Sequence, residues 1–377
     1  MTPAAGATGE GQGRVHLQLK PGLRTVWRAP DTVQIGLEPG RGAVLQGLTM
    51  EDRALVERLV EGVDAATLPT EGPPGERVRR LLALLRDGDV LLTRRSGRGV
   101  LARVGPAAQR LAPDAAVWGV VHRGDGDSWE LIAERGRREV HVVGAGRLAA
   151  DLAGTLIAAG VGKVLALPAP PPSWPLRRQA TGDVLARPDL VVLIRASAAD
   201  SVGAEHLLAA DVPHLSVVLR EAGLVVGPLV LPGHGPCLRC LDLHRTDRDP
   251  AWPRLLAQLP GRATAADAGE SASARLGAGL AALQVLGHLD GLTETGEAVG
   301  AGPPASVGAT LEVDLPDGLV YRRAWPVHPA CGCSWPAAGA ERPPARRNDA
   351  RDVPDAPEAP DPDSQGRSTR SAVRMKP

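Results

Sequence analysis

The stretch HVVGAGRLAADLAGTLIAAGVGKVLAL, from His141 to Leu167, decides the fold. A β-branched run meets a tight turn that contains Gly144 and Gly146, and leucines then recur at helical spacing. A second apolar run, Val164 to Leu167, has the length of a strand. This order predicts a βαβ unit that opens a doubly wound α/β sheet.

A glycine turn of this kind lets the backbone approach a pyrophosphate and directs a helix N-terminus at it. Gly144 and Gly146 are therefore candidate nucleotide-binding residues, although glycines also serve close packing of strand against helix. A ribose-binding site needs an acidic residue at the end of the second strand. Here that place reads Leu-Pro-Ala-Pro-Pro-Pro-Ser-Trp, and no acid occurs between Asp151 and Asp183. The sequence therefore has the glycine turn of a nucleotide site but lacks its ribose-binding acidic residue. This argues against ATP with Mg²⁺ as a cofactor.

Composition sets the broad class of protein. The 377 residues suit two domains with tails, and 43 basic residues balance 43 acidic ones. This balance gives no electrostatic case for binding to nucleic acid or to a membrane. The chain has neither a signal-peptide pattern nor 18 consecutive apolar residues, so we expect a cytoplasmic protein. Cysteines in a reducing compartment indicate metal binding before disulfides.

Patterning divides the chain into five segments. Residues 1–13 and 337–377 are expected to be disordered, and residues 96–139 to form a connector. Residues 14–95 are expected to form a small winged-helix-like α+β domain, and residues 140–336 an α/β domain. In the first domain, Thr49 and Asp52 form a capping box for a helix that Gly62 ends.

The first domain has three candidate roles. Its thirteen basic and eleven acidic residues lack the strong basic excess of a DNA reader. Dimerisation or packing is the plain alternative. The third role is peptide recognition, in which a strand edge takes an extended peptide as an added strand. We assign that edge to the second strand of the expected hairpin, whose residues are Thr32, Val33, Gln34, Ile35, Gly36 and Leu37.

The second domain alternates strands with helices, which predicts a largely parallel sheet. The apolar runs are residues 190–194, 214–219 and 224–231. Small residues from Ala274 to His288 indicate a tightly packed helix, and residues 310–315 and 319–324 read as a hairpin.

The strongest signal for a site is the cysteine set. Cys237 and Cys240 form one close pair, Cys331 and Cys333 form another, and the chain has no other cysteine. Two pairs of thiolates make a closed tetrahedral site, so we predict structural Zn²⁺ that staples the C-terminal hairpin to the domain. Because Cys-x-Cys is a tight spacing, His328 or His234 remains an alternative ligand.

Other polar residues favour structural roles. Asp200 fits an N-cap of the helix that begins near Ser201. The acidic and histidine residues after Cys240 are predicted to lie in a solvated loop, with a metal-like polar cluster as the alternative: Asp242, His244, Asp247 and Asp249. Trp252 is expected to anchor a loop that covers the glycine turn or docks a partner.

The glycine turn, the later apolar strands and the two cysteine pairs, in this order, resemble the ThiF-type superfamily over residues 140–335. Its members adenylate the C-terminal carboxylate of a small protein. Leu176-Arg177-Arg178-Gln179 is similar to the family's Arg-Gln segment, so the resemblance makes Arg178 a candidate phosphate ligand. The ribose acid, the lysine and the Mg²⁺-binding aspartate of the family have no counterpart here. The resemblance therefore implies a nucleotide site that has lost adenylation, as in a pseudoenzyme.

Residues 14–95 resemble the PqqD-like peptide-recognition domain. A recognition domain fused to a zinc-containing ThiF-like domain is similar to the leader-peptide-binding partner of azole-forming cyclodehydratases, in its actinobacterial branch. The resemblance implies a precursor peptide and a YcaO-type enzyme as partners, and it leaves a homodimer open. Two alternatives remain: an active adenylyltransferase for a ubiquitin-like or sulfur-carrier protein, and a DNA-associated winged-helix ligand sensor.

Overall fold

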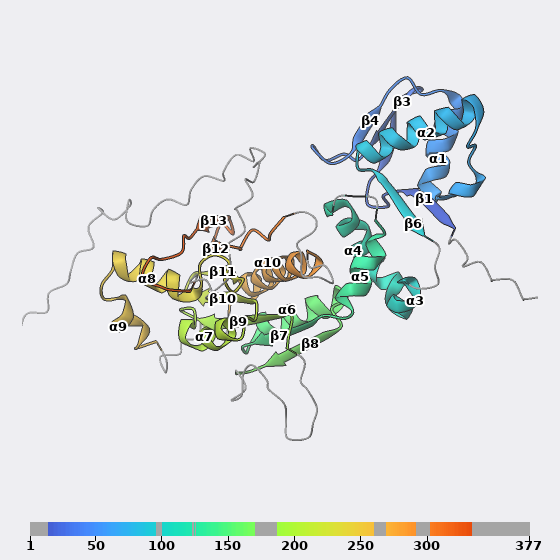
Figure 1. Cartoon of the computed structure of the whole chain (residues 1–377). Helices are drawn as coiled ribbons and strands as arrows, with labels where there is room; N and C mark the ends of the chain where they lie inside the picture. Colours follow the sequence, from blue (N-terminus) through green and yellow to red (C-terminus); the bar gives the residue numbers. More distant parts are fainter. Residues whose placement is uncertain are drawn as a thin grey trace, which may run out of the picture. The chain divides into compact units, whose positions relative to one another are not determined.

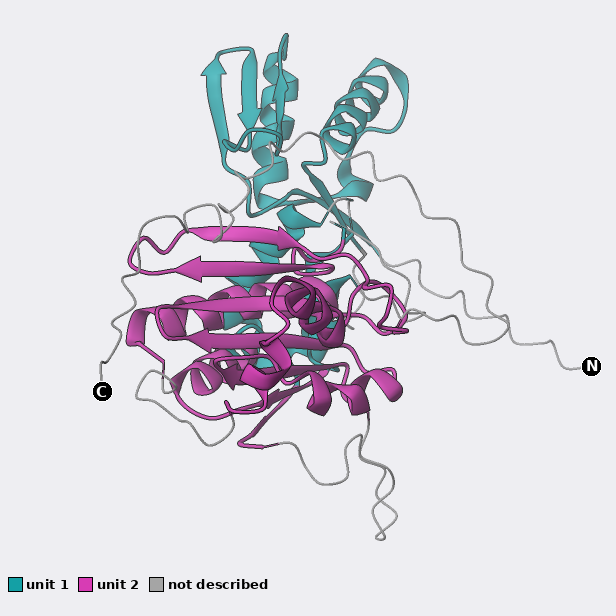
Figure 2. Ribbon diagram, turned by 90° about the vertical axis from the view of Figure 1, so that its left-hand side faces the viewer, with its two compact units in different colours: residues 1–138, 158–162, 290–302 teal, residues 139–157, 163–289, 303–377 magenta. Residues whose placement is uncertain are grey.

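The computed structural model describes residues 14–95, 100–122, 124, 126–169, 187–259, 269–291 and 302–333. The chain separates into two compact units (Figure 2). Unit 1 contains residues 1–138, 158–162 and 290–302. Unit 2 contains residues 139–157, 163–289 and 303–377. None of the helices in the described ranges is long and apolar enough to cross a membrane.

Unit 1 begins with two small antiparallel sheets and two helices (Figure 1). Its strands are β1 (Val15–Leu19), β2 (Thr25–Ala29), β3 (Thr32–Ile35), β4 (Ala43–Leu45), β5 (Val63–Asp64) and β6 (Leu91–Arg95). One sheet has the order β5-β1-β6 and the other β2-β3-β4. The helices are α1 (Met50–Glu61) and α2 (Gly72–Asp87), with the short 3-10 helix η1 (Ala65–Thr67) between them. Side chains of both sheets and both long helices share one apolar core.

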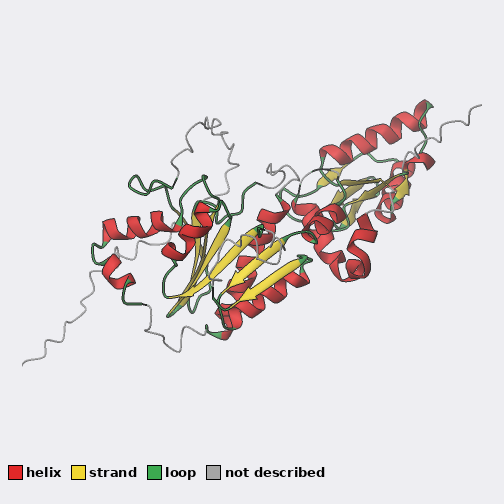
Figure 3. Ribbon diagram, turned by 60° about the horizontal axis from the view of Figure 1, so that its bottom comes forward, coloured by secondary structure: helices red, strands yellow, loops and turns green. Residues whose placement is uncertain are grey.

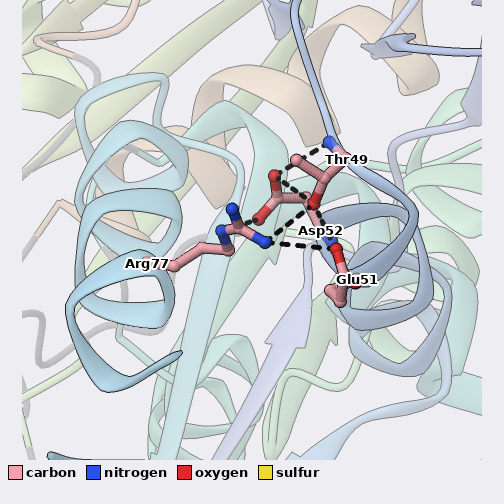
Figure 4. Close-up of polar contacts among 4 residues, drawn as sticks. All are labelled: Thr49, Glu51, Asp52 and Arg77. Atoms are coloured by element: carbon pink, nitrogen blue, oxygen red, sulfur yellow. Dashed lines mark hydrogen bonds and ion pairs between the residues drawn. The ribbon is translucent and has the colours of Figure 1, made fainter. Parts of the chain in front are cut away.

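The capping box at the start of α1 is confirmed (Figure 4). The Thr49 hydroxyl accepts the backbone N–H of Asp52 at 3.3 Å, and the Asp52 carboxylate accepts the backbone N–H of Thr49 at 3.0 Å. Arg77, on α2, donates to the Thr49 hydroxyl at 3.2 Å and to the Glu51 carboxylate at 3.1 Å. The cap therefore starts α1 and also holds α2 against it. Gly62 ends α1 as the sequence indicates, with φ of 100°.

The assignment of residues 32–37 to a sheet edge is wrong. Strand β3 pairs with β2 on one side and with β4 on the other, so it is the middle strand of its sheet. The physical reason is the third strand, Ala43–Leu45, which occupies the side that a two-stranded hairpin would leave open. Val33 and Ile35 of β3 are fully buried. The free edges of this sheet belong to β2 and β4.

The segment that the sequence predicts as a partly folded connector contains several helices. Residues 96–139 include α3 (Val100–Val104), the 3-10 helix η2 (Gly105–Ala107), α4 (Ala108–Val121) and α5 (Ser128–Arg135). A buried ion pair lies beside these helices. The Arg135 guanidinium donates to both carboxylate oxygens of Asp290, at 2.7 and 2.5 Å, and also to the carbonyl of Ala159.

Unit 2 is built on a seven-stranded sheet of order β13-β12-β11-β10-β9-β7-β8. Its strands are β7 (Glu139–Val143), β8 (Lys163–Leu167), β9 (Leu190–Ala196), β10 (His214–Arg220), β11 (Gly223–Val230), β12 (Ala309–Asp314) and β13 (Val320–Ala324). Its helices are α6 (Arg147–Ala158), α7 (Ser201–Ala209), α8 (Leu238–Arg248), α9 (Trp252–Leu256) and α10 (Ser271–Asp290). Helices cover both sides of this sheet (Figure 3).

The expectation of a largely parallel sheet is wrong in one half. Strands β8, β7, β9 and β10 run parallel, whereas β11, β12 and β13 each pair antiparallel to their neighbours. The reason is turn length, since β10 and β11 are joined by Glu221 and Ala222 alone and such a short link forces an antiparallel pair. The sheet of unit 2 is therefore mixed.

The βαβ unit around the glycine turn is confirmed. Strand β7 leads through the turn into α6, and β8 returns parallel to β7. Gly144 has φ of 153°, and a Cβ at this position would lie 2.7 Å from the Cβ of Ile194. Gly146 has φ of 87°. Both the backbone conformation and the close approach of β9 thus require glycine at position 144.

Candidate functional site

The four cysteines lie on two segments of unit 2. Cys237 is the N-cap of α8 and Cys240 lies in the first turn of that helix. A turn precedes them, in which the His234 N–H donates to the Leu231 carbonyl at 2.8 Å. Cys331 and Cys333 follow β13. The fold therefore brings together two cysteine pairs that are about ninety residues apart in the sequence.

The four sulfur atoms form one compact cluster. The Sγ–Sγ distances are 3.9 Å for Cys237 and Cys240, 3.4 Å for Cys237 and Cys331, and 3.3 Å for Cys240 and Cys333. All four lie within 4.8 Å of one another, and all four thiols are free. Tetrahedral Zn²⁺ with bonds of about 2.3 Å would place sulfurs about 3.8 Å apart. The donor set and its spacing are compatible with zinc.

The electrostatics of the cluster also suit a cation. The hydrogen bond with Cys237 lowers the pKa of the Cys240 thiol, and the same bond raises the pKa of Cys237. Burial raises the pKa of Cys333. At this spacing the cluster favours a thiolate at Cys240, and that negative charge opposes ionisation of its neighbours Cys237 and Cys333. A bound divalent cation would offset that repulsion and allow all four to act as thiolates.

The histidines kept as alternative ligands lie outside the sulfur cluster. His234 bonds through Nδ1 to the Pro232 carbonyl at 3.1 Å. His328 bonds through Nε2 to the Asp247 carboxylate at 2.8 Å. Neither histidine belongs to the sulfur group, and His328 instead forms a separate group with His244 and Asp247.

The second candidate region is the carboxyl end of β7 and β9, beside Gly144 and Gly146. Here Arg195, in β9, donates to the Asp200 carboxylate at 3.0 and 3.2 Å and to the carbonyl of Ile194 at 3.0 Å. The other Asp200 oxygen accepts the Gly203 N–H at 2.7 Å, so the predicted N-cap of α7 is confirmed. The end of β9 therefore carries an Arg–Asp ion pair.

Two further features are expected of a nucleotide site: an acidic residue at the end of β8 and the phosphate ligand Arg178. Strand β8 ends at Leu167 and is followed by Pro168 and Ala169. Arg178, the candidate phosphate ligand, lies outside the described residues. The sequence analysis missed the ion pair of Arg195, because an arginine near the end of an apolar run does not indicate its own partner.

The solvated loop expected after Cys240 is a helix, so that prediction is wrong. Asp242, His244 and Asp247 lie on α8, and Asp249 is its C-cap. The reason is that Cys237 is the N-cap of a helix. Burial of Leu238 and Leu241 then stabilises that helix. Trp252, expected in a loop, begins α9 and donates its indole N–H to Asp242 at 3.1 Å.

Comparisons with known proteins find similarity of structure and none of sequence. No family model matches the sequence, and no curated protein matches it. E. coli MccB with AMPCPP and MccA superposes with a TM-score of 0.57 at 12% identity, over 85% of this chain and 99% of that one. The microcin C7 biosynthetic enzyme MccB in complex with N-formylated MccA gives 0.54 at 10% identity, over 85% and 99%.

The heterocyclase TruD gives a TM-score of 0.56 at 18% identity. The match covers 85% of this chain and 43% of TruD, so the chain spans less than half of that protein. Identities this low speak for the fold alone. They show that this chain shares an α/β fold with MccB and TruD, in agreement with the α/β fold that the sequence predicts.

Proposed function

We propose that this chain binds a precursor peptide through unit 1, holds structural Zn²⁺ in unit 2, and presents the peptide to a partner modifying enzyme without adenylating it. The carrying observation is the likeness to MccB and TruD over 85% of the chain. Solved MccB structures are named with MccA, and TruD is named a heterocyclase. In this proposal a YcaO-type partner enzyme modifies the peptide with ATP. Residues 14–95 bind the peptide as a PqqD-like domain.

The edge of β2 supports the peptide-binding part. The Gly36 N–H donates to the Arg24 carbonyl at 2.8 Å, so the backbone groups of Arg24 face β3. Because backbone groups alternate sides along an antiparallel strand, those of Thr25 face the free edge. An extended peptide can pair with such an edge through main-chain hydrogen bonds.

A cavity of about 320 Å³ lies close to this edge, within unit 1. Its apolar part includes Leu37 and Val117, which are 57% and 58% exposed. Its charged rim includes Arg24, Glu38 and Arg41. We assign this cavity to one apolar side chain of the bound peptide. Main-chain hydrogen bonds give a peptide affinity, and a pocket for a side chain gives it specificity.

The Arg195–Asp200 pair supports the non-catalytic part. The Arg195 guanidinium already balances the charge of the Asp200 carboxylate, so Mg²⁺ would compete with that cation for the carboxylate. Phosphoryl transfer depends on positioning and charge neutralisation, and the acid and the lysine that resemblance would require are absent from the sequence. The competing function is ATP-dependent adenylation, which the MccB structure with ATP favours.

Calorimetric titration with Mg²⁺·ATP separates these two functions. The proposal expects no saturable heat and no thermal shift up to millimolar ATP. Saturable binding together with ATP-dependent pyrophosphate release would establish adenylation and refute the non-catalytic part.

The peptide-binding part has its own test. Peptides enriched from a displayed library on the intact protein are measured by fluorescence polarisation against two variants. Thr25→Pro removes the edge N–H and is expected to abolish binding, whereas Thr25→Ala keeps that N–H and should retain it. Equal binding by both variants would exclude the β2 edge.

The metal part is tested by elemental analysis of the purified protein. We expect one Zn²⁺ per chain, lost in Cys237→Ser together with the folded C-terminal half of unit 2. Unchanged metal content and melting temperature in that variant would remove the tetrad from the proposal.

A further inference from the structure

A second polar cluster adjoins the sulfur cluster in unit 2. It consists of His244 and Asp247 on α8 and His328 in the segment between β13 and the second cysteine pair. Their donor atoms lie within 4.8 Å of one another. Two histidines and a carboxylate are donors that also suit a metal ion, so the hydrogen bonds of the His328 ring decide what the cluster does.

The hydrogen bonds of His328 fix its tautomer. The backbone N–H of Ala330 donates to His328 Nδ1 at 3.1 Å, so Nδ1 carries a lone pair. The ring proton of neutral His328 therefore sits on Nε2, which lies 2.8 Å from an oxygen of Asp247. Nε2 donates to this carboxylate, and the same atom is not available to a metal while the Ala330 bond stands.

The backbone of the same residue touches both cysteine pairs. The His328 N–H bonds to the Cys240 thiol, and the His328 carbonyl accepts the Cys331 N–H at 3.0 Å. His328 is 8% exposed. One buried residue thus contacts a cysteine of α8, shapes the turn that leads to Cys331, and reaches a carboxylate two turns along α8.

His244 adds a second attachment for this segment. Its Nε2 donates to the Pro326 carbonyl at 3.0 Å, and its ring packs edge-to-face on His328 with 4.7 Å between ring centres. Helix α8, which bears Cys237 and Cys240, therefore holds residues 326–328 by two side-chain hydrogen bonds. Neither bond requires a metal ion.

We infer that Asp247 and His328 form a latch that positions Cys331 and Cys333 against the cysteines of α8, so that the tetrad is preorganised for its cation. Asp247 is a positioning residue in this scheme and not a ligand. The inference rests on the proposed metal centre and assigns residues that the sulfur tetrad does not include. Groups that hydrogen-bond a metal ligand directly contribute about 10- to 100-fold in metal affinity, and Asp247 lies one contact further out, on His328.

The test measures Co²⁺ affinity of the full chain by competition with a chelator, and follows the thiolate-to-cobalt absorption band. Asp247→Ala is expected to weaken Co²⁺ binding by about 10-fold, the lower end of that range, while the band and the single equivalent per chain are kept. Asp247→Asn retains an oxygen acceptor and should stay closer to the wild-type affinity. Asp317→Ala is the matched control, because Asp317 is exposed in the β12–β13 turn of the same unit.

Each other outcome overturns a distinct claim. An affinity in Asp247→Ala within twofold of wild type overturns the latch and leaves the tetrad standing. A second Co²⁺ equivalent in the wild type that Asp247→Ala loses shows that the cluster is a metal site instead of a latch. No Co²⁺ binding by the wild type removes the metal centre itself, and the latch with it.

Discussion

Replacing Asp290 with alanine should destabilise unit 1 far more than removing an exposed carboxylate. The Arg135 and Asp290 side chains are 1% and 0% exposed, and two hydrogen bonds of 2.7 and 2.5 Å join them. In Asp290→Ala the guanidinium stays buried and keeps only the Ala159 carbonyl, the Trp118 ring at 4.9 Å and Asp114 at 4.0 Å.

Leaving one charge of a buried pair without its partner costs about 3–5 kcal/mol. Because Asp114 and the indole ring offer partial compensation, we expect a value near the lower end, about 3 kcal/mol. For a unit of this size that loss lowers the melting temperature by roughly 10 °C. Replacing both partners, as Arg135→Met with Asp290→Leu, should recover most of the loss, since an apolar pair of similar volume needs no compensation.

Urea unfolding followed by tryptophan fluorescence measures this effect, and Trp118 lies next to the substituted pair. Glu57→Ala is the control, because Glu57 pairs with Arg53 at 3.1 Å while the two side chains are 56% and 39% exposed. That control should change the free energy of unfolding by less than about 1 kcal/mol. If Asp290→Ala lost no more than Glu57→Ala, the argument from burial would be refuted.

Three further changes test other parts of the chain. Thr49→Ala removes the acceptor for the Asp52 N–H and should lower the free energy of unfolding by about 1 kcal/mol in thermal denaturation; no change would show that the cap is dispensable. Leu152→Ala should cost about 2–5 kcal/mol by urea unfolding, because Leu152 is fully buried in α6, and a cost below about 1 kcal/mol would contradict this packing. Burial lowers the pKa of His214 from its ordinary 6.5 to about 4. The unfolded chain therefore takes up a proton near pH 6.5 that the folded chain refuses until about pH 4. Stability should fall by up to about 3 kcal/mol across that window, and a His214→Leu variant with the same acid-side slope would refute the assignment.

Local signals explain which elements of the fold could be predicted. The capping box at Thr49 and the stop at Gly62 define α1 without reference to the rest of the chain. The glycine turn at Gly144 likewise predicts its own strand and helix. Strand β1 (Val15–Leu19) was missed because its main partner, β6, lies more than seventy residues further on, and its own sequence carries no turn or cap signal.

The same limit applies to sheet position and direction. The alternation of residues 32–35 predicts a strand, yet only its pairing with Ala43–Leu45 makes that strand central. The apolar runs of β10 and β11 predict buried strands, and the two-residue link between them was the signal for an antiparallel pair. In both cases the information lies in the neighbouring segment.

The same distinction between local signals and distant neighbours applies to the candidate site. Spacing of the cysteines predicts the tetrad, whose thiols the structure brings together. Spacing leaves His328 open as a ligand, because its role depends on Asp247 and Ala330, which only the folded chain brings to its ring. The ion pair of Arg195 with Asp200 is similar, since a guanidinium five residues from a cap is uninformative until both lie at the end of β9.

The two candidate sites of unit 2 differ in their need for a ligand. At the end of β9, Arg195 balances Asp200, and the two Asp200 oxygens accept hydrogen bonds from Gly203 and Arg195. Mg²⁺ would compete there with the Arg195 guanidinium for the Asp200 carboxylate, so the negative charge at this site is already balanced without a metal ion. At the sulfur cluster, thiolates 3.3–3.9 Å apart repel one another unless a cation lies among them. This contrast is the physical reason why we propose a cation at the sulfur cluster and no adenylation at the end of β9.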